Sequence, residues 1–380
     1  MDERARILIV DDEPFNVDYL EQELEDLGCE TASAQNGREA LEQVAVEAPD
    51  VILLDIMMPE MDGFQVLAHL KANETWRDIP VIVISALDDM SSIVKGIEMG
   101  AEDYLPKPFD PVLLKARIGA SLEKKRLRDR EVLHLQRITE ELALAWQIQA
   151  GFLPNELPDI PGWQLAATLK PSRETSGDFY DLILLPNGQL GILVADVVDK
   201  GMAAALFMVL SRTLIRTYAV QYHTQPSSVL QAANLRILMD ISTDQFVTVF
   251  YGILDPVTGT LTYCNAGHNP PYLLSAQESA AVQALPRTGM PLGIFEDSNW
   301  EQKAVQLSPG DMLVLYTDGL TEASSPQEEF FGEERLLDLA KSNLGHSAQD
   351  VQDALMEHVH QFIGDAPQFD DITLAVVVRE

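Results

Sequence analysis

The first third of the chain contains short apolar runs, each followed by polar residues and a helical pattern. These runs are "RILIV" (6–10), "VILLD" (51–55), "VIVIS" (81–85) and the less apolar "DYLPK" (103–107). One helical pattern covers residues 17–28 and ends at Gly28, a residue typical of helix C-termini. Short apolar strands separated by helices are typical of a parallel sheet covered on both faces. We therefore expect an N-terminal α/β domain that binds its ligands at the carboxyl ends of the strands.

The length and charge of the chain limit the classes of protein that it can be. A chain of 380 residues is too long for one ordinary core, so we expect two domains. The formal net charge of -34 repels phosphates, so we expect no nucleic-acid binding and no membrane association. The two cysteines, Cys29 and Cys264, form no disulfide framework, which favours a cytoplasmic location. The N-terminal residues do not resemble a signal peptide, and no apolar run approaches the roughly 18 residues of a membrane helix.

A proline-free stretch from residue 117 to residue 152 predicts one long helix. Its apolar residues recur every three or four positions, at Leu135, Ile138, Leu142, Ala145 and Phe152, with Ile148 or Gln149 at the remaining position. This spacing is typical of a coiled-coil seam and predicts a homodimer, although Leu122 and Leu127 are out of register. The alternative is a helix that packs on its own domain. The prolines of "LPNELPDIPG" (153–162) end the helical pattern.

The remainder of the chain has strands and helices in separate blocks. The expected strands are 163–170, 179–185, 189–197, 246–255, 259–267, 271–275, 303–308, 311–319 and 372–380, and the expected helices are 202–222, 226–242, 333–344 and 348–363. Many hairpin strands with separate helical blocks indicate an α+β layered β-sandwich flanked by helices. The expected organisation is an α/β domain at 1–122, a helical linker at 123–153 and a second domain at 154–380.

Polar side chains lie at the carboxyl ends of the predicted strands of the first domain. Asp11 and Asp12 follow the first strand, Asp55 ends the second apolar run, Ser85 ends the third, and Lys107 ends the fourth. Because the carboxyl ends of parallel strands share one edge of a sheet, these groups should converge. Clustered carboxylates repel one another unless a hard cation is bound, and a lysine beside a hydroxyl can hold phosphate oxygens.

Residues 5–122 resemble the receiver domain of response regulators. The motifs "VDDE" (10–13), "LLDIMMPEMDG" (53–63), "ISA" (84–86) and "YLPKPF" (104–109) occur in family order. The resemblance implies a flavodoxin-like five-stranded parallel sheet, phosphorylation on Asp55 by a sensor histidine kinase, and a cis Lys107–Pro108 bond. It also implies Mg²⁺ bound by Asp12, Asp55 and the carbonyl of Met57 with Asp11 close by, a switch pair of Ser85 and Tyr104, and a phosphate contact from Lys107. The alternative is a flavodoxin-like domain that is not phosphorylated.

Carboxylates also recur at strand ends in the second domain. Asp178 lies in "SGDFYD", Asp196 in "VADVVDKG", Asp318 in "YTDGLTEA", and Asp370 in "FDDIT". A single such carboxylate is usually a turn former, but four together favour two hard cations a few ångströms apart. Oxygen ligands suit Mg²⁺ or Mn²⁺, and the sequence has neither a Cys/His cluster for zinc nor the motif of a serine or cysteine nucleophile.

This half resembles the metal-dependent PPM-type (protein phosphatase 2C-like) serine/threonine phosphatases, in the bacterial branch that regulates sigma factors and sporulation. The motifs "SGDFYD", "ADVVDKG", "ALFM", "NAGHNPP", "YTDGLTEA", "FFGEERL" and "FDDIT" occur in family order. The resemblance implies that Asp196 bridges two Mn²⁺ or Mg²⁺ ions, the carbonyl of Val197 helps to hold the second, Asp318 and Asp370 hold the first, Asp178 binds through water, and Arg173 contacts the substrate phosphate. Ser176 replaces a usual glycine, and Val198 and Asp199 stand where a small hydroxyl residue and a glycine are common. His268 and Asp181 are interpreted as structural.

The two resemblances together predict a response regulator in which phosphorylation of Asp55 controls a phosphoserine or phosphothreonine phosphatase. The expected substrate is an anti-sigma-factor antagonist, and the helical linker is expected to transmit the signal by a change in dimerisation or packing. Two alternatives are a module that captures a phosphoprotein without hydrolysis and an interaction scaffold whose output is the coiled coil.

Overall fold

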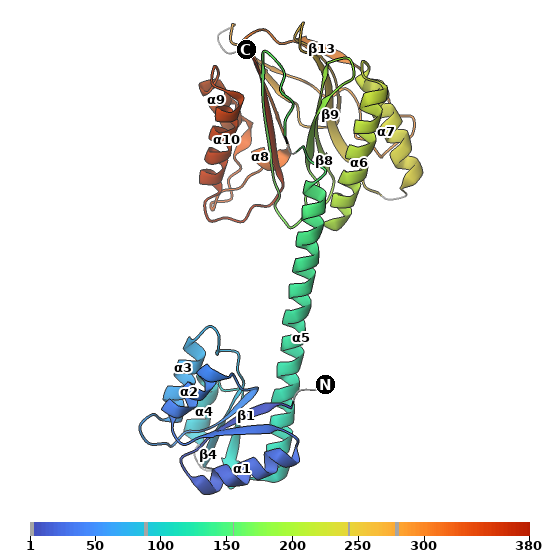
Figure 1. The fold of residues 1–380 in the computed structure, drawn as a ribbon. Coiled ribbons are helices and arrows are strands. Elements are labelled where there is room, and N and C mark those ends of the chain that lie inside the picture. The colour runs from blue at the N-terminus through green and yellow to red at the C-terminus, as the bar shows by residue number, and fades with distance from the viewer. Residues whose placement is uncertain (1–3, 87–89, 155, 242–243, 278–280) are drawn as a thin grey trace. The chain divides into compact units, whose positions relative to one another are not determined.

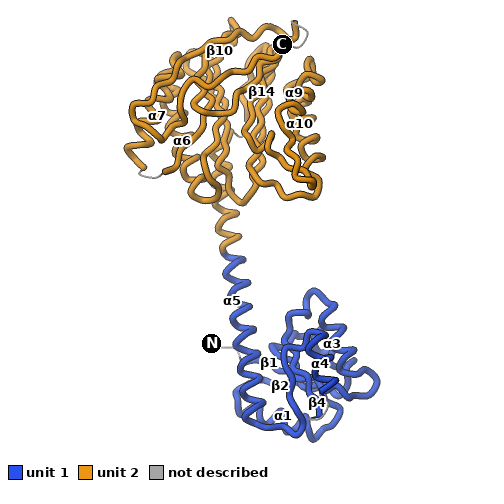
Figure 2. Tube along the Cα trace, turned by 180° about the vertical axis from the view of Figure 1, so that it is seen from behind, with its two compact units in different colours: residues 1–137 blue, residues 138–380 orange. Residues whose placement is uncertain are grey.

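The computed structural model describes residues 4–86, 90–154, 156–241, 244–277 and 281–380. The chain forms two compact units, residues 1–137 and residues 138–380 (Figures 1 and 2). Helix α5, Pro111–Ala150, begins in the first unit and ends in the second. Each unit has its own hydrophobic core.

The first unit is an α/β domain built on a five-stranded sheet. Its strands are β1 (Arg6–Val10), β2 (Glu30–Ala34), β3 (Val51–Asp55), β4 (Val81–Ala86) and β5 (Asp103–Lys107). Its other helices are α1 (Pro14–Asp26), α2 (Gly37–Val46), α3 (Gly63–Ala72) and α4 (Met90–Glu98). All four strand pairings are parallel, in the order β2-β1-β3-β4-β5. The flavodoxin-like fold that the sequence predicts is confirmed.

Side chains of this sheet alternate between two cores. Ile7 and Ile9 of β1 pack with residues of α1 and of the first turns of α5, whereas Leu8 and Val10 pack with residues of α2 and α3. The sheet is therefore covered on both faces, and its polar groups are left to the strand ends. The Lys107–Pro108 peptide bond at the end of β5 is cis, as the sequence predicts.

The second unit contains two five-stranded sheets. The first sheet has the order β13-β10-β9-β8-β7 and the second has the order β12-β11-β14-β15-β6. Their strands are β6 (Trp163–Lys170), β7 (Phe179–Leu184), β8 (Leu190–Val197), β9 (Val247–Asp255), β10 (Thr260–Ala266), β11 (Tyr272–Leu274), β12 (Val282–Ala284), β13 (Lys303–Gln306), β14 (Met312–Tyr316) and β15 (Ile372–Arg379). All pairings of these strands are antiparallel.

Helices cover the outer faces of the two sheets, giving four layers (Figure 1). Helices α6 (Met202–Gln221) and α7 (Pro226–Asp240) pack against the first sheet through one core, and α9 (Gly332–Ser342) and α10 (Ala348–Ile363) pack against the second through another. A third core lies between the sheets. The helix that the sequence predicts at 226–242 ends at Asp240, and Ser242 lies outside the described residues. The predicted layered sandwich is confirmed.

Helix α6 is long and apolar enough to cross a membrane by length and composition alone. The sequence-based expectation that no segment approaches this length is therefore wrong. However, 44% of the relevant window is buried inside the unit. Its Arg212 and Arg216 form ion pairs with the buried Asp181 of β7. These contacts are those of a core helix, so the composition of α6 is weak evidence for a membrane span.

Helix α5 includes residues 123–150 of the predicted linker (123–153), and the seam residue Phe152 lies beyond its end. Ile138 and Ile148 are 40% and 61% exposed in the single chain, whereas Gln149 is buried in the second unit. The exposed apolar side chains agree with a seam, but homodimer formation stays a prediction.

Candidate functional site

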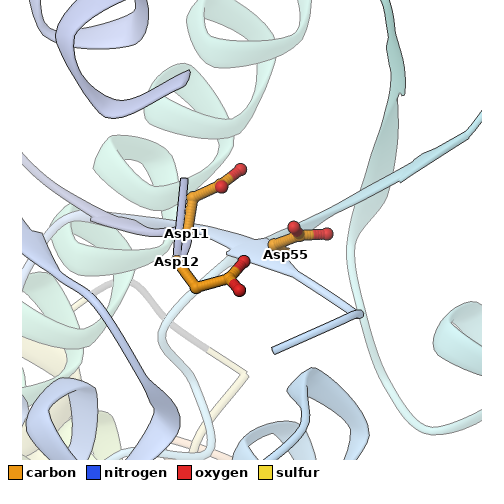
Figure 3. A group of neighbouring side chains, drawn as sticks. All are labelled: Asp11, Asp12 and Asp55. Carbon is orange, nitrogen blue, oxygen red and sulfur yellow. The ribbon is translucent and has the colours of Figure 1, made fainter. Parts of the chain in front are cut away.

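Three carboxylates gather at the carboxyl end of β1 and β3 in the first unit (Figure 3). Asp11 and Asp12 follow β1, Asp55 ends β3, and one oxygen of each lies within 4.8 Å of the others. Asp11 and Asp55 are buried, whereas Asp12 is exposed. The Lys107 ammonium reaches this cluster from β5, at 2.9 Å from Asp11 and 2.7 Å from Asp55.

The protonation of this cluster reflects its burial. Burial raises the pKa of Asp55, and the Asp11 charge adds to that effect, while the hydrogen bond from Lys107 opposes it. Burial lowers the pKa of Lys107, but hydrogen bonds to Asp55 and Asp11 outweigh it and raise the pKa overall. Lys107 therefore stays charged beside the buried carboxylates Asp11 and Asp55. Its single positive charge balances only one of these two carboxylates, and Asp12 adds a further negative charge.

The other predicted receiver residues follow β3 or belong to β4 and β5. The Met57 amide donates to Asp55 Oδ1 over 3.4 Å, and the Met57 side chain is exposed. Ser85, near the end of β4, is buried, and its hydroxyl donates to the Ala86 carbonyl over 3.3 Å. Tyr104 of β5 is half-buried, and the Arg117 guanidinium lies 5.2 Å from its ring centre. The structure thus places a lysine in contact with Asp55, and a buried hydroxyl directly after Ile84, the residue that pairs with Asp55.

The predicted acidic residues of the second unit lie at strand ends in both sheets. Asp178 precedes β7, Asp196 is near the end of β8, Asp318 begins the short helix α8 (Asp318–Thr321) after β14, and Asp370 precedes β15. Strands β7 and β8 belong to one sheet and β14 and β15 to the other. The carboxylates therefore meet at one end of the sandwich, between its two sheets.

Asp178 is buried and held at its carboxylate by two threonines. The hydroxyls of Thr317 and Thr373 donate to Asp178 Oδ2 over 2.6 and 2.7 Å. Burial raises the Asp178 pKa well above its ordinary value, and the charges of Asp196 and Asp371 raise it further. Burial and the neighbouring negative charges thus both disfavour the charged form of Asp178.

The remaining carboxylates are half-buried, and their negative charges repel one another; they are Asp196, Asp318 and Asp370. Burial, then the charges of Asp318 and Asp370, raise the pKa of Asp196 to about 7. Burial and the Asp370 charge also raise the pKa of Asp318. Lys200, from the loop after β8, lies 3.0 Å from Asp370 Oδ2 and also donates to the Phe369 carbonyl. An ammonium thus partly neutralises one of the predicted metal ligands.

Two glycines allow the loops of this site to approach closely. A side chain at Gly319 would lie 2.0 Å from the Asp371 carbonyl oxygen, so the start of α8 can rest on the segment that carries Asp370. A side chain at Gly177 would lie 3.2 Å from the Val197 carbonyl oxygen. Any larger residue would push these backbone segments apart.

The sequence pairs Asp371 with Asp370 before the last strand, but it does not predict the contacts of Asp371 or of Gln149. Asp371 accepts hydrogen bonds from Ser172, Ser176 and Gly177. Its position in "FDDIT" was the available signal. Gln149, at the end of α5, bonds to both backbone polar groups of Ser176, and nothing in the sequence pointed to that contact.

Three remaining positions from the sequence analysis lie in loops: Arg173, Val198 and Asp199. Arg173 is exposed in the loop between β6 and β7. Asp199 has a φ of 69°, a left-handed conformation, which explains why glycine would be common there. Val198, half-buried before it, has no such backbone requirement in the structure.

Both clusters have the donor set of hard divalent cations. The donors are oxygens. Burial, with repulsion between the carboxylates added to it, raises the pKa of Asp55, Asp178, Asp196 and Asp318, so a bound cation would relieve an unfavourable arrangement. Within the described part of the chain, the receiver triad is the one group of three whose ligand atoms all lie within 4.8 Å. The carboxylates of the second unit are more widely spread, which suits two ions better than one.

Comparison with known proteins identifies both units. The model of the response regulator receiver domain matches residues 7–119. The model of stage II sporulation protein E (SpoIIE) matches residues 186–380, which is more than half of the chain. The chain belongs to the SpoIIE family. It carries a receiver domain ahead of its SpoIIE domain, and this architecture confirms the sequence-based identification.

Individual relatives share the SpoIIE domain. Protein IcfG of Synechocystis sp. is 36% identical over 265 residues, which is 63% of this chain and 41% of IcfG. The phosphoserine phosphatase RsbU of Bacillus subtilis is 28% identical over 64% of this chain and 72% of RsbU. The SiaA-PP2C domain of Pseudomonas aeruginosa shares the fold, with a TM-score of 0.57 and 22% identity over 65% of this chain and 98% of that domain. The chain thus spans less than half of the length of IcfG.

Proposed function

We propose that this SpoIIE-family protein is a metal-dependent phosphoserine or phosphothreonine protein phosphatase controlled by phosphorylation of its receiver domain. The observation that carries the proposal is the convergence of Asp178, Asp196, Asp318 and Asp370 from two sheets at one end of the sandwich. Oxygen donors in such an arrangement suit two Mn²⁺ or Mg²⁺ ions. The name of RsbU, a phosphoserine phosphatase, supports the same activity.

The residues of the SpoIIE domain have different proposed roles in metal binding and substrate binding. Asp196, the Val197 carbonyl, Asp318 and Asp370 would hold the two ions, and Asp178 would contribute from further out. When bound, the ions lower the pKa of water and orient it for attack on phosphorus. Thr317 and Thr373 fix the direction of Asp178, since both donate to the same carboxylate oxygen. Lys200, which lies inside the site, is better placed to contact a substrate phosphate than the exposed Arg173.

In the receiver domain, Asp55 accepts a phosphoryl group from a sensor histidine kinase. Asp11, Asp12, Asp55 and the Met57 carbonyl bind Mg²⁺, which shields the incoming charge. Lys107, 2.7 Å from Asp55, neutralises phosphate oxygens, and Ser85 and Tyr104 change position in response. The geometry of the acidic triad and Lys107 supports these roles.

The signal passes to the SpoIIE domain through helix α5. Its last turn carries Gln149, whose side-chain amide donates to the Ser176 carbonyl over 2.6 Å and accepts from the Ser176 amide over 3.1 Å. Ser176 lies two residues before Asp178, so a shift of α5 would move the segment that carries this carboxylate. Exposed apolar residues of α5 support a homodimer as the switch.

The substrate proposed here is a small phosphorylated protein of the anti-sigma-antagonist type, dephosphorylated in the cytoplasm. The name of RsbU, a phosphoserine phosphatase, supports a phosphoserine substrate, and the resemblance to the sigma-regulating branch of phosphatases is what suggests this class of protein. An acidic enzyme also suits a substrate that presents basic residues around its phosphoserine, because like charges would slow association.

Phosphate release from a phosphoserine peptide tests the activity. With Mn²⁺ present, the wild-type chain should release phosphate, EDTA should stop the reaction, and Asp196→Asn should lower the rate by more than about a hundredfold. The control is Asp338→Asn, the same change at an exposed carboxylate of α9 outside the metal set. If the folded wild-type protein binds the peptide and Mn²⁺ but releases no phosphate, the domain is a binding module instead.

A further inference from the structure

The loop before β7 contains a hydrogen-bond relay that reaches Asp178. The Asp178 amide donates to the Ser176 hydroxyl oxygen over 3.1 Å, and the Ser176 hydroxyl donates to Asp371 Oδ2 over 2.8 Å. A contact of 3.2 Å also joins this hydroxyl to the Asp178 carbonyl, but the single hydroxyl proton favours the shorter, charge-assisted bond. The serine therefore accepts from one aspartate and donates to the other.

Asp371 anchors this relay to the start of β15. Its Oδ1 accepts from the amide and hydroxyl of Ser172 over 2.7 and 2.9 Å, and its Oδ2 also accepts from the Gly177 amide over 2.8 Å. With the Ser176 hydroxyl, four donors satisfy this buried carboxylate. The side chain thus fastens the loop of residues 172–177 to the segment that carries Asp370.

Ser176 is fully buried and fits its backbone without strain. Its exposed fraction is 0%, and it is absent from the described non-glycine residues with positive φ, which are Glu60, Asp199 and Glu328. A glycine, expected here from the family resemblance, would leave the Asp178 amide and one acceptor site of Asp371 without this partner. Buried groups that lose a partner are costly, and a freer backbone would add to the loss.

We propose that Ser176 is a positioning residue that sets the metal affinity of the SpoIIE domain through Asp178. The Ser176 hydroxyl holds the Asp178 backbone amide, and the hydroxyls of Thr317 and Thr373 hold one oxygen of the Asp178 carboxylate, which interacts with the predicted metal ligand Asp196. The inference rests on the proposed metal-dependent function, because it assumes that this carboxylate helps to bind a cation. Outer partners of metal ligands typically change metal affinity by about 10-fold to 100-fold.

Mn²⁺ binding to the full chain, measured by calorimetry, tests this role without any substrate. Every protein carries Asp12→Asn, so that the receiver triad does not contribute. Ser176→Ala and Ser176→Gly should each weaken Mn²⁺ binding by about 10-fold, with kcat at saturating Mn²⁺ changed by less than about twofold. Ser172→Ala is the matched control: it removes another hydroxyl from Asp371, keeps the relay, and should leave the affinity within about twofold.

Hydrogen exchange provides a second readout that needs neither metal nor activity. In the wild-type chain the Asp178 amide should exchange slowly, and both Ser176 variants should lose that protection while Ser172→Ala keeps it. Unchanged Mn²⁺ affinity in a folded Ser176 variant, or rapid exchange of this amide in the wild type, would overturn the proposal. A wild-type chain that binds Mn²⁺ but releases no phosphate would instead count against the proposed function.

Discussion

Lys200 is placed to compete with a metal ion. Its ammonium lies 3.0 Å from Asp370 Oδ2, and both side chains are about one-third exposed, at 31% and 34%. A partly exposed ion pair contributes at most about 1 kcal/mol, so its removal should strengthen Mn²⁺ binding by up to about fivefold. Calorimetry on Lys200→Gln in the Asp12→Asn background checks this. Lys341→Gln, an exposed lysine of α9, controls for the change in net charge. Weaker Mn²⁺ binding by Lys200→Gln would contradict the competition.

His268 should make the protein less stable as the solution becomes acidic. Burial lowers its pKa from 6.5 to about 4, and the charge of Arg287 adds to this effect. Between these two pH values the unfolded chain binds a proton that the folded chain rejects, so the free energy of unfolding falls as pH falls. The full loss is about 3 kcal/mol. Above pH 6.5 the residue has no such effect.

Urea unfolding at several pH values measures this contribution. His268→Asn should flatten the decline between pH 6.5 and pH 4 relative to the wild type, whereas His358→Asn, at an exposed site of α10, should not. The Nδ1 atom of His268 pairs with the Thr248 hydroxyl over 2.8 Å, and asparagine retains a polar group near that position. Parallel curves for the wild type and His268→Asn would rule out this source of acid sensitivity.

At the residue scale, the sequence identifies the carboxylates but not the groups that hold them. Asp178, Asp196, Asp318 and Asp370 are predictable because a carboxylate at the start or end of an apolar strand is a local pattern. The hydroxyls on Asp178 come from Thr317 and Thr373, which lie 139 and 195 positions away in the chain. Such pairs depend on which strands become neighbours, and local periodicity carries no information about that.

At the scale of elements, a buried ion pair fixes α6 on β7. Asp181 is fully buried, Arg212 lies 2.8 Å from it with a side chain 10% exposed, and Arg216 lies 2.8 Å from it with a side chain 46% exposed. Asp181→Asn would leave the buried Arg212 charge without its counterion. We expect a loss of about 3–5 kcal/mol in the free energy of unfolding.

Arg216→Ala is the matched change, since it removes the more exposed partner and should cost no more than about 1 kcal/mol. Guanidinium unfolding of the two variants gives both values. Equal losses would mean that α6 is held mainly by its apolar face and that the burial of Arg212 is unimportant. The comparison of Asp181→Asn with Arg216→Ala is informative because α6 is apolar enough to have the composition of a membrane helix.

The elements that sequence reasoning found are those with an apolar run or a helical period. Strand β2, "ETASA", was missed because it lies at the sheet edge and has one fully buried residue, Ala34. Strand β12 is an edge strand of three residues and was missed for the same reason. The central strands β1, β3 and β4 were found because each is buried on both faces of the sheet.

At the scale of the whole molecule, the proposed coupling of Asp55 to the phosphatase site runs through helix α5, which begins in the first unit and ends in the second. Gln149 bonds to the Ser176 backbone, so Gln149→Ala should uncouple the phosphatase rate from the state of Asp55 while leaving a folded, Mn²⁺-binding SpoIIE domain. The exposed Gln147, on the same helix, supplies the control. The ratio of rates with and without beryllofluoride, which mimics phosphorylated Asp55, is the quantity to compare. An unchanged ratio in Gln149→Ala would place the coupling elsewhere.

The most direct test measures Mn²⁺-dependent phosphate release by the full chain before and after beryllofluoride is added. Phosphate release should require Mn²⁺, and its rate should change when beryllofluoride binds. The rate of Asp55→Asn should not change when beryllofluoride is added. A folded protein that binds Mn²⁺ but releases no phosphate, in either state of Asp55, would contradict the central claim. If beryllofluoride changed neither the rate of phosphate release nor the oligomeric state, control by the receiver domain would be contradicted.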